Sequence, residues 1–173
     1  ADRARGATAT LYRPILASRA FWRLAPICGL AQGVLVSYQG LWVAPWQRDV
    51  AGRAVDQYVE DLLWVALAIA LGNLASGFVA SALGRLGLSQ NRVFGLLMSL
   101  FLLVQLLLLV AGGRWSSLLW IAFAAIGATS ILAFALLAEQ FPSHLLGRAN
   151  SLLNLTVFIA AFIVQFGIGR VID

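Results

Sequence analysis

Uncharged and mainly apolar stretches follow one another along most of the chain, and short charged segments separate them. Five such stretches cover residues 24–47, 62–84, 93–113, 115–138 and 149–169. Each reaches the roughly 20 residues with which a helix crosses the hydrocarbon core of a bilayer. No water satisfies backbone amides at that depth, and no period of two suggests a barrel, so each stretch is predicted to be an α-helix. The pattern predicts an all-α integral membrane protein, a five-span helical bundle.

Composition agrees with this interpretation. Of the 173 residues, 61% are hydrophobic and 11% are charged, whereas an ordinary soluble domain carries roughly 25% charged residues. The third stretch contains nine leucines, which at about −0.5 kcal/mol each supply roughly −4 kcal/mol of insertion free energy. We therefore expect the lipid bilayer as a partner, and we interpret the third stretch as a peripheral, lipid-facing helix.

The distribution of arginine predicts the orientation in the membrane. All twelve basic residues are arginines; eight fall on the side that carries the N-terminus and four on the other. The positive-inside rule then places the N-terminus in the cytoplasm, with the chain in the cell inner (plasma) membrane. The positive charge is thus a topological signal, and no nucleic-acid partner is expected. Tryptophans gather near the predicted outer ends of the spans, as the headgroup boundary favours: Trp42, Trp46, Trp64, Trp115 and Trp120.

The domain organisation is simple. Residues 1–18 mix small, polar and basic types and are predicted to be a cytoplasmic linker, so the transmembrane helical domain covers residues 19–173. Because the only methionine is Met98, we expect a fragment of a longer chain. The segment from Gln47 to Asp61 carries four acidic residues and is predicted to be a solvated external connection.

Amide side chains within three spans supply the candidate substrate-binding residues. Gln32 and Gln39 are seven residues apart and therefore point the same way on a helix. Asn73 lies in the second span, and Asn154 and Gln165 share a face of the fifth. Such amides form either interhelical hydrogen bonds, worth about 0.6 kcal/mol each, or the wall of a watery substrate path. The residues themselves leave both possibilities open.

Other residues suggest packing rather than chemistry. Gly29, Gly33 and Gly40 form a stripe beside the glutamines, which predicts the close approach of another helix. Cys28 is interpreted as a small apolar core residue, and Asp61 as an interfacial carboxylate at a span end. No acidic or basic side chain lies inside the five stretches, and no nucleophile with its base is evident. We therefore expect no enzyme, catalytic residue, metal site or cofactor.

One segment resembles a family signature. The residues GFVASALGRLGLSQNR look like the motif that joins the second and third spans, and again the eighth and ninth, in the major facilitator superfamily (MFS) of transporters. Gly77, Gly84 and Arg85 match this gating motif, whereas Ser81 and Ala82 replace its acid and the basic neighbour. In addition, FPSHLLGRANSLLNL resembles the start of the family's eleventh span, and LYRPILASRAFWRLAP the approach to its seventh.

The resemblance implies that the five spans are the seventh to eleventh of an MFS transporter, part of a six-helix half. It further implies a secondary active transporter that moves a small-molecule substrate by alternating access, with the N-terminal half of the same transporter as partner. The alternative is a non-transporting membrane scaffold or subunit that packs against partner helices. A channel is disfavoured, because no charged ring or carbonyl filter sequence is evident.

Overall fold

The computed structural model describes residues 12–172. Within that range there is no strand, and five helical rods are long and apolar enough to cross a membrane. The predicted all-helical fold class with five candidate spans is thereby confirmed. The first eleven residues of the predicted linker 1–18 lie outside the described part of the chain.

The first rod is not a uniform α-helix. It begins as α2 (Arg19–Ser37) and continues through the π-helical turn η1 (Tyr38–Trp42), the short α3 (Val43–Pro45) and a second π-helical turn, η2 (Trp46–Val50). Pro45 has no amide N–H to donate to the preceding turn. The rod therefore departs from regular α geometry over the part that carries most of its aromatic residues.

The fourth rod is also interrupted. A 3₁₀ turn, η3 (Thr129–Ile131), separates α6 (Ser116–Ala128) from α7 (Leu132–Ala138). The hydroxyls of Thr129 and Ser130 in this turn donate to the carbonyls of Ile126 and Gly127, each at 2.6 Å. Hydroxyl bonds of this kind to the preceding turn often bend a helix. The remaining elements are α4 (Val55–Arg85), α5 (Gln90–Ala111) and α8 (Ser143–Ile172).

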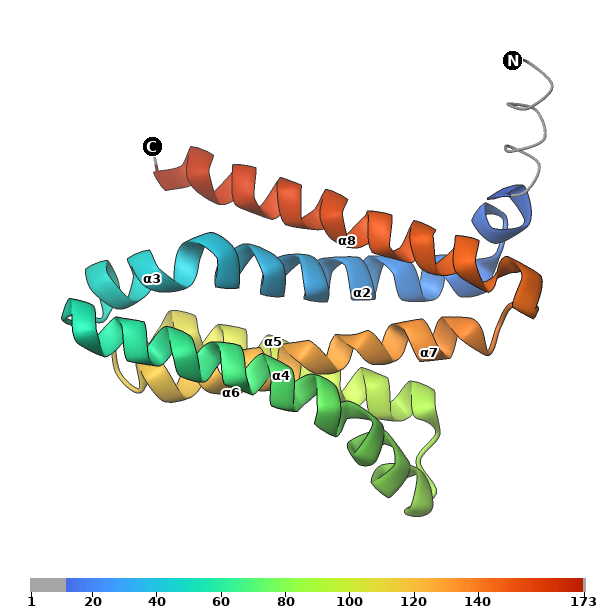
Figure 1. Cartoon of the computed structure of the whole chain (residues 1–173), viewed down its shortest axis with the longest axis horizontal. Coiled ribbons are helices and arrows are strands. Elements are labelled where there is room, and N and C mark those ends of the chain that lie inside the picture. Colours follow the sequence, from blue (N-terminus) through green and yellow to red (C-terminus); the bar gives the residue numbers. More distant parts are fainter. Residues whose placement is uncertain (1–11, 173) are drawn as a thin grey trace.

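The rods form two groups (Figure 1). The helices α2 and α8 lie side by side, and α6 packs against both α4 and α5. The rods run alternately up and down, so one end of the bundle collects η2, the start of α4, the end of α5, the start of α6 and the end of α8. We call this the η2 end.

Two of the predicted glycines allow the close contact between α2 and α8. A Cβ at Gly29 would lie 3.0 Å from Thr156 Oγ1, and a Cβ at Gly33 would lie 2.7 Å from the Cβ of Ala160. The predicted close approach is confirmed at these two positions. Gly40 has no neighbouring atom within 4 Å of such a Cβ, so it takes no part in the contact.

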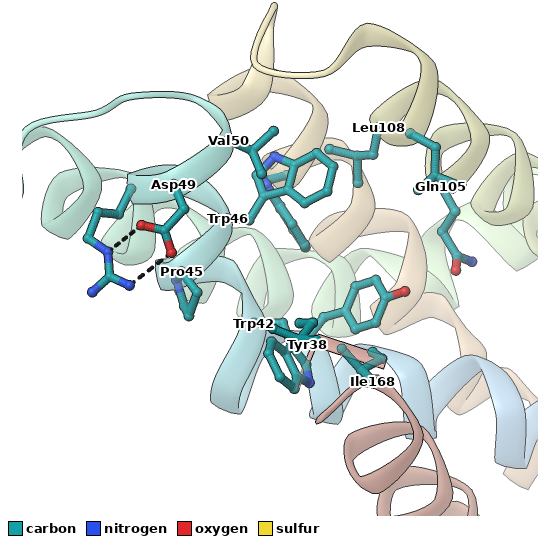
Figure 2. Close-up of a pocket in the computed structure, with 13 residues that line it drawn as sticks. Tyr38, Trp42, Pro45, Trp46, Asp49, Val50, Gln105, Leu108 and Ile168 are labelled. Atoms are coloured by element: carbon teal, nitrogen blue, oxygen red, sulfur yellow. Dashed lines mark hydrogen bonds and ion pairs between the residues drawn. The ribbon is translucent and has the colours of Figure 1, made fainter. Parts of the chain in front are cut away.

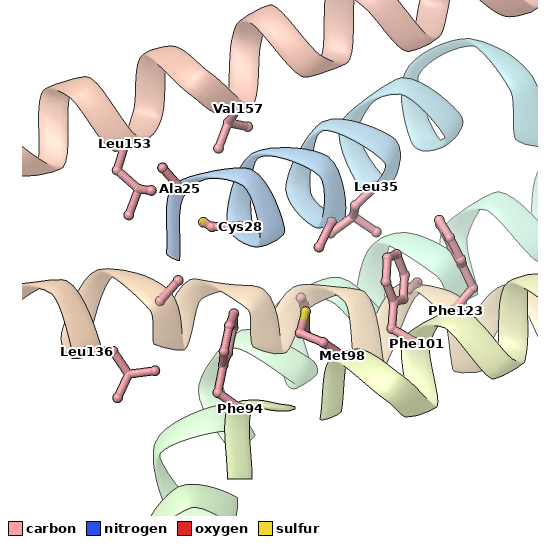
Figure 3. Packing of buried hydrophobic residues seen from close by; sticks show 14 of the residues in the cluster. Ala25, Cys28, Leu35, Phe94, Met98, Phe101, Phe123, Leu136, Leu153 and Val157 are labelled. Carbon is pink, nitrogen blue, oxygen red and sulfur yellow. The ribbon is translucent and has the colours of Figure 1, made fainter. Parts of the chain in front are cut away.

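The core is aromatic and aliphatic and draws on every rod (Figure 3). Phe101 of α5 and Phe123 of α6 have ring centroids 4.9 Å apart, and both are almost fully buried. Leu153 of α8 and Cys28 of α2 lie in the same cluster. Cys28 is fully buried with a free thiol, as predicted.

Large apolar side chains also cover the outside of the bundle. On α5, Leu103, Leu106 and Val110 are exposed on the side opposite the buried Phe101. Soluble proteins rarely expose contiguous apolar surface on this scale. Such a surface is suited to lipid or to further helices. Phenylalanines form part of it on α8: Phe158, Phe162 and Phe166.

Candidate functional site

The predicted substrate-binding residues lie mainly on the outer faces of the helices. Gln39, Asn73 and Asn154 are exposed, and Gln32 and Gln165 are partly buried. None of the five lines either of the two pockets described below. The five residues therefore do not gather around either of these two pockets.

The predicted gating-motif residues are also exposed. Gly77 and Gly84 lie in the second half of α4, and a Cβ at either position would meet no atom within 4 Å. Arg85 is the last residue of α4, is exposed and forms no ion pair among the described residues. The chain itself leaves this stretch of α4 uncovered.

A pocket of about 590 Å³ lies between four rods at the η2 end (Figure 2). Four aromatic side chains dominate its wall, and Gln105 of α5 supplies the one amide side chain in the lining. A second pocket, of about 350 Å³, lies between α2 and α5, is lined by apolar residues and shares Gln105. We call the larger one the aromatic pocket. Its lining residues are Tyr38, Trp42, Pro45, Trp46, Arg48, Asp49, Val50, Gln105, Leu108, Leu109, Trp120, Ile168 and Ile172.

Helical spacing and one π turn place three aromatic side chains of the first rod in this pocket. Tyr38, Trp42 and Trp46 are spaced four residues apart, and in a regular α-helix with 3.6 residues per turn each step of four rotates the side chain by about 40°. A π turn closes its hydrogen bond one residue later than an α turn and so holds more residues. The η1 turn reduces the rotation between Tyr38 and Trp42, and all three side chains reach the same pocket.

Hydrogen-bond donors in these walls lack acceptors. The indole Nε1 atoms of Trp42, Trp46 and Trp120 are buried, and no described residue accepts a hydrogen bond from them. An unsatisfied buried donor costs about 1–3 kcal/mol, so native structures contain few. These three N–H groups are inaccessible even to water, so they lie behind the pocket surface and do not face the pocket itself.

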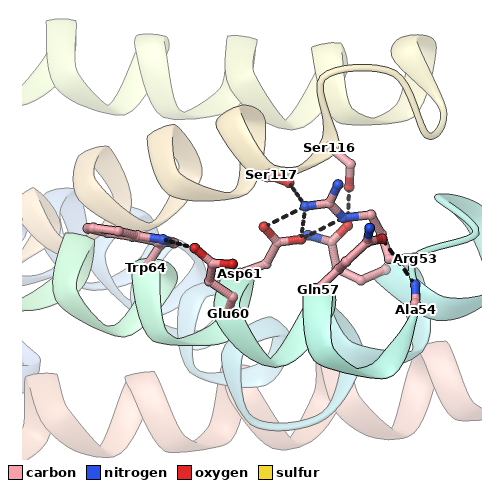
Figure 4. A network of polar contacts seen from close by, with 9 residues as sticks. Arg53, Ala54, Gln57, Glu60, Asp61, Trp64, Ser116 and Ser117 are labelled. Atoms are coloured by element: carbon pink, nitrogen blue, oxygen red, sulfur yellow. Dashed lines mark hydrogen bonds and ion pairs between the residues drawn. The ribbon is translucent and has the colours of Figure 1, made fainter.

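Beside the pocket lies a network of buried polar groups (Figure 4). Arg53 donates from Nε and Nη2 to the two carboxylate oxygens of Asp61, each at 2.9 Å, and from Nη2 to Ser117 Oγ at 2.8 Å. Gln47 Nε2 donates to Asp61 Oδ2 at 2.9 Å, and Ser116 Oγ donates to Gln47 Oε1. The network joins η2, the loop after it, α4 and α6.

This network corrects the prediction for the segment from Gln47 to Asp61. Gln47 is fully buried, and Asp61 is 4% exposed in the second turn of α4. Only residues 51–54 lie between helices. The prediction of a solvated connection is therefore wrong at both ends of the segment, because the Arg53 guanidinium compensates the carboxylate.

The pocket and the network share the turn η2. Trp46, Arg48, Asp49 and Val50 line the pocket, whereas Gln47 binds Asp61 and Ser116. The network therefore fixes the segment that forms one wall of the pocket. Arg48 and Asp49 bind each other through two hydrogen bonds of 2.6 and 2.8 Å, and both side chains are exposed.

Comparison with known protein families, with characterised proteins and with solved structures gives no significant match. The resemblance to the MFS therefore rests on the sequence motifs alone.

Proposed function

We propose that the chain is part of a secondary active transporter of the MFS type, which moves a small solute across the membrane by alternating access. The observation that carries the proposal is the aromatic pocket, because spans far apart in sequence build a cavity of small-molecule size within a bundle of membrane-type helices. Pockets for small molecules commonly measure about 300–1,000 Å³ and lie between the helices of bundles.

The exposed amides fit the same proposal in a different way. Asn73 and Asn154 lie on uncovered faces of α4 and α8, and polar side chains in membrane spans normally face other helices or a watery cavity. In a two-halved transporter, these faces would meet the N-terminal half and form the substrate path there. Gln32, Gln39 and Gln165 would extend the path along α2 and α8.

The test is uptake by the full-length protein in proteoliposomes, with a mixture of small solutes detected by mass spectrometry. We expect at least one solute to accumulate above the level in protein-free vesicles. At least one of Gln32→Ala, Gln39→Ala, Asn73→Ala and Asn154→Ala should then lose uptake with normal insertion, while Gln90→Ala, an exposed amide at the start of α5, should not. No accumulation of any solute would refute transport. Uptake by all four variants at the level of the unsubstituted protein would remove these residues from the path.

The exposed amides also favour a second candidate, a membrane scaffold without transport activity. In that case Asn73 and Asn154 bind helices of another subunit. A partner that co-purifies in fixed stoichiometry, without any solute uptake, would support the scaffold over the transporter.

A further inference from the structure

The walls of the aromatic pocket carry no net charge. Its two charged residues, Arg48 and Asp49, form a two-bonded pair with each other at the exposed edge. The other lining residues are aromatic or aliphatic, apart from Gln105 (Figure 2). Neither an organic cation nor an anion would therefore find an unpaired countercharge in the pocket.

The aromatic rings pack against one another. Trp120 meets Trp46 edge to face with ring centroids 6.2 Å apart, and meets Tyr38 in the same way at 5.9 Å. Tyr38 also stacks on Phe123 at 5.5 Å. A cation can bind over a ring face, but the one carboxylate in this pocket, Asp49, is already paired with Arg48. The rings instead offer faces and edges against which a flat, apolar body can pack.

Two side chains in the pocket can donate a hydrogen bond to a ligand. The indole N–H groups of Trp42, Trp46 and Trp120 are not among them, because these atoms are buried and do not face the open pocket. They are Tyr38 and Gln105, which line the pocket, bind no other side chain among the described residues, and can both donate. An oxygen acceptor on a ligand could therefore bind either of them.

We infer that the aromatic pocket binds an uncharged, largely apolar and flat small molecule that carries a carbonyl or similar oxygen acceptor. The rings of Trp42 and Trp46 contact its flat body, and the Gln105 amide N–H donates to its oxygen. This inference deepens the proposed transport function by naming a class of substrate. It rests on that function only for the ligand being transported, since binding is measured without transport.

The probe for the test is prodan, an uncharged naphthalene that carries a propionyl ketone and whose emission shifts to the blue in an apolar site. The chain is placed in lipid nanodiscs, and the signal of protein-free nanodiscs is subtracted. We expect saturable binding that unlabelled uncharged naphthyl ketones displace. Tetraphenylphosphonium, a cation, and anilinonaphthalene sulfonate, an anion, should displace prodan far less.

Two pairs of variants locate the bound probe. Trp42→Ala should weaken prodan binding about tenfold and Gln105→Met about fivefold. The matched controls, Trp64→Ala on α4 and Gln90→Met on α5, remove the same side chains at exposed positions outside the pocket and should leave the affinity unchanged. The readout is the emission of prodan itself, because substitutions of tryptophan alter energy transfer. Circular dichroism checks the helix content of each variant.

Three results would overturn the inference. The first is the absence of saturable prodan binding, and the second is an affinity for prodan that is the same in Trp42→Ala and Gln105→Met as in their controls. The third is stronger displacement of prodan by the cation or the anion than by the ketones. The uptake assay separates this failure from failure of transport. Solute uptake that persists in Trp42→Ala would retain the transporter and remove the pocket as its substrate site. Prodan binding without any uptake would retain the pocket alone.

Discussion

Removing either partner of the Arg53–Asp61 pair is expected to destabilise the fold, and by different amounts. Breaking a buried ion pair costs about 3–5 kcal/mol, because the remaining charge stays buried without a partner. The Asp61 side chain is 6% exposed and that of Arg53 is 34% exposed. Arg53→Ala leaves a carboxylate in the interior and should cost about 5 kcal/mol, whereas Asp61→Ala leaves a guanidinium that water partly solvates and should cost about 3 kcal/mol.

The measurement is the free energy of unfolding in mixed micelles, with the denaturing detergent titrated and helix content followed by circular dichroism. The double variant should cost less than the sum of the single variants by about 2 kcal/mol, because each single change already breaks the pair. Arg48→Ala is the matched control. Its guanidinium also forms two bonds to a neighbouring carboxylate, but these side chains are 63% and 57% exposed, so no measurable change is expected.

Additive costs in the double variant would refute this reasoning, since they would show that Arg53 and Asp61 act independently. A smaller cost for Arg53→Ala than for Asp61→Ala would also contradict it. In that case the stranded carboxylate would not be the main penalty, and the assignment of Asp61 to a desolvated site would be wrong.

Three further predictions follow from the packing. Gly33→Leu should destabilise the fold by about 3 kcal/mol or more, because a side chain there overlaps α8. The control Gly40→Leu should be tolerated, and the free energies of unfolding of the two variants are compared in mixed micelles. Phe101→Ala should cost about 3–5 kcal/mol as a core truncation, and Phe162→Ala, at an exposed position, much less in the same assay. The Cys28 thiol, fully buried, should resist maleimide in mild detergent and react in denaturing detergent, as mass spectrometry would detect.

Much of the fold could be predicted because a bilayer imposes simple rules. Gaps between charges located the five rods, since a charge inside hydrocarbon is costly. Spacing along a helix was enough to predict the close approach at Gly29 and Gly33, because both lie on the one face that meets α8. These inferences use only local sequence and the thickness of the membrane.

The candidate site could not be predicted in the same way. Ser116 reaches Gln47 across 69 positions of sequence, and this contact, together with Arg53, explains how Asp61 is buried. The leucines of residues 93–113 predict a lipid-facing helix, yet Gln105 within this stretch lines both pockets. Its isolation in a leucine run was the signal available, since an amide among leucines needs a local reason to be there.

The first rod contains one part of the site that its sequence indicates and one that it does not. Residues at i, i+4 and i+8 of a regular helix spread over only about 80°, so the spacing of Tyr38, Trp42 and Trp46 indicates a shared face. The wider turn at η1 brings Tyr38 and Trp42 closer into register, whereas nothing in the spacing indicates that Gln47 binds Asp61. An irregular turn of this kind is often found at a functional site. Here η2 divides one short segment between a pocket and the network that holds that segment in place.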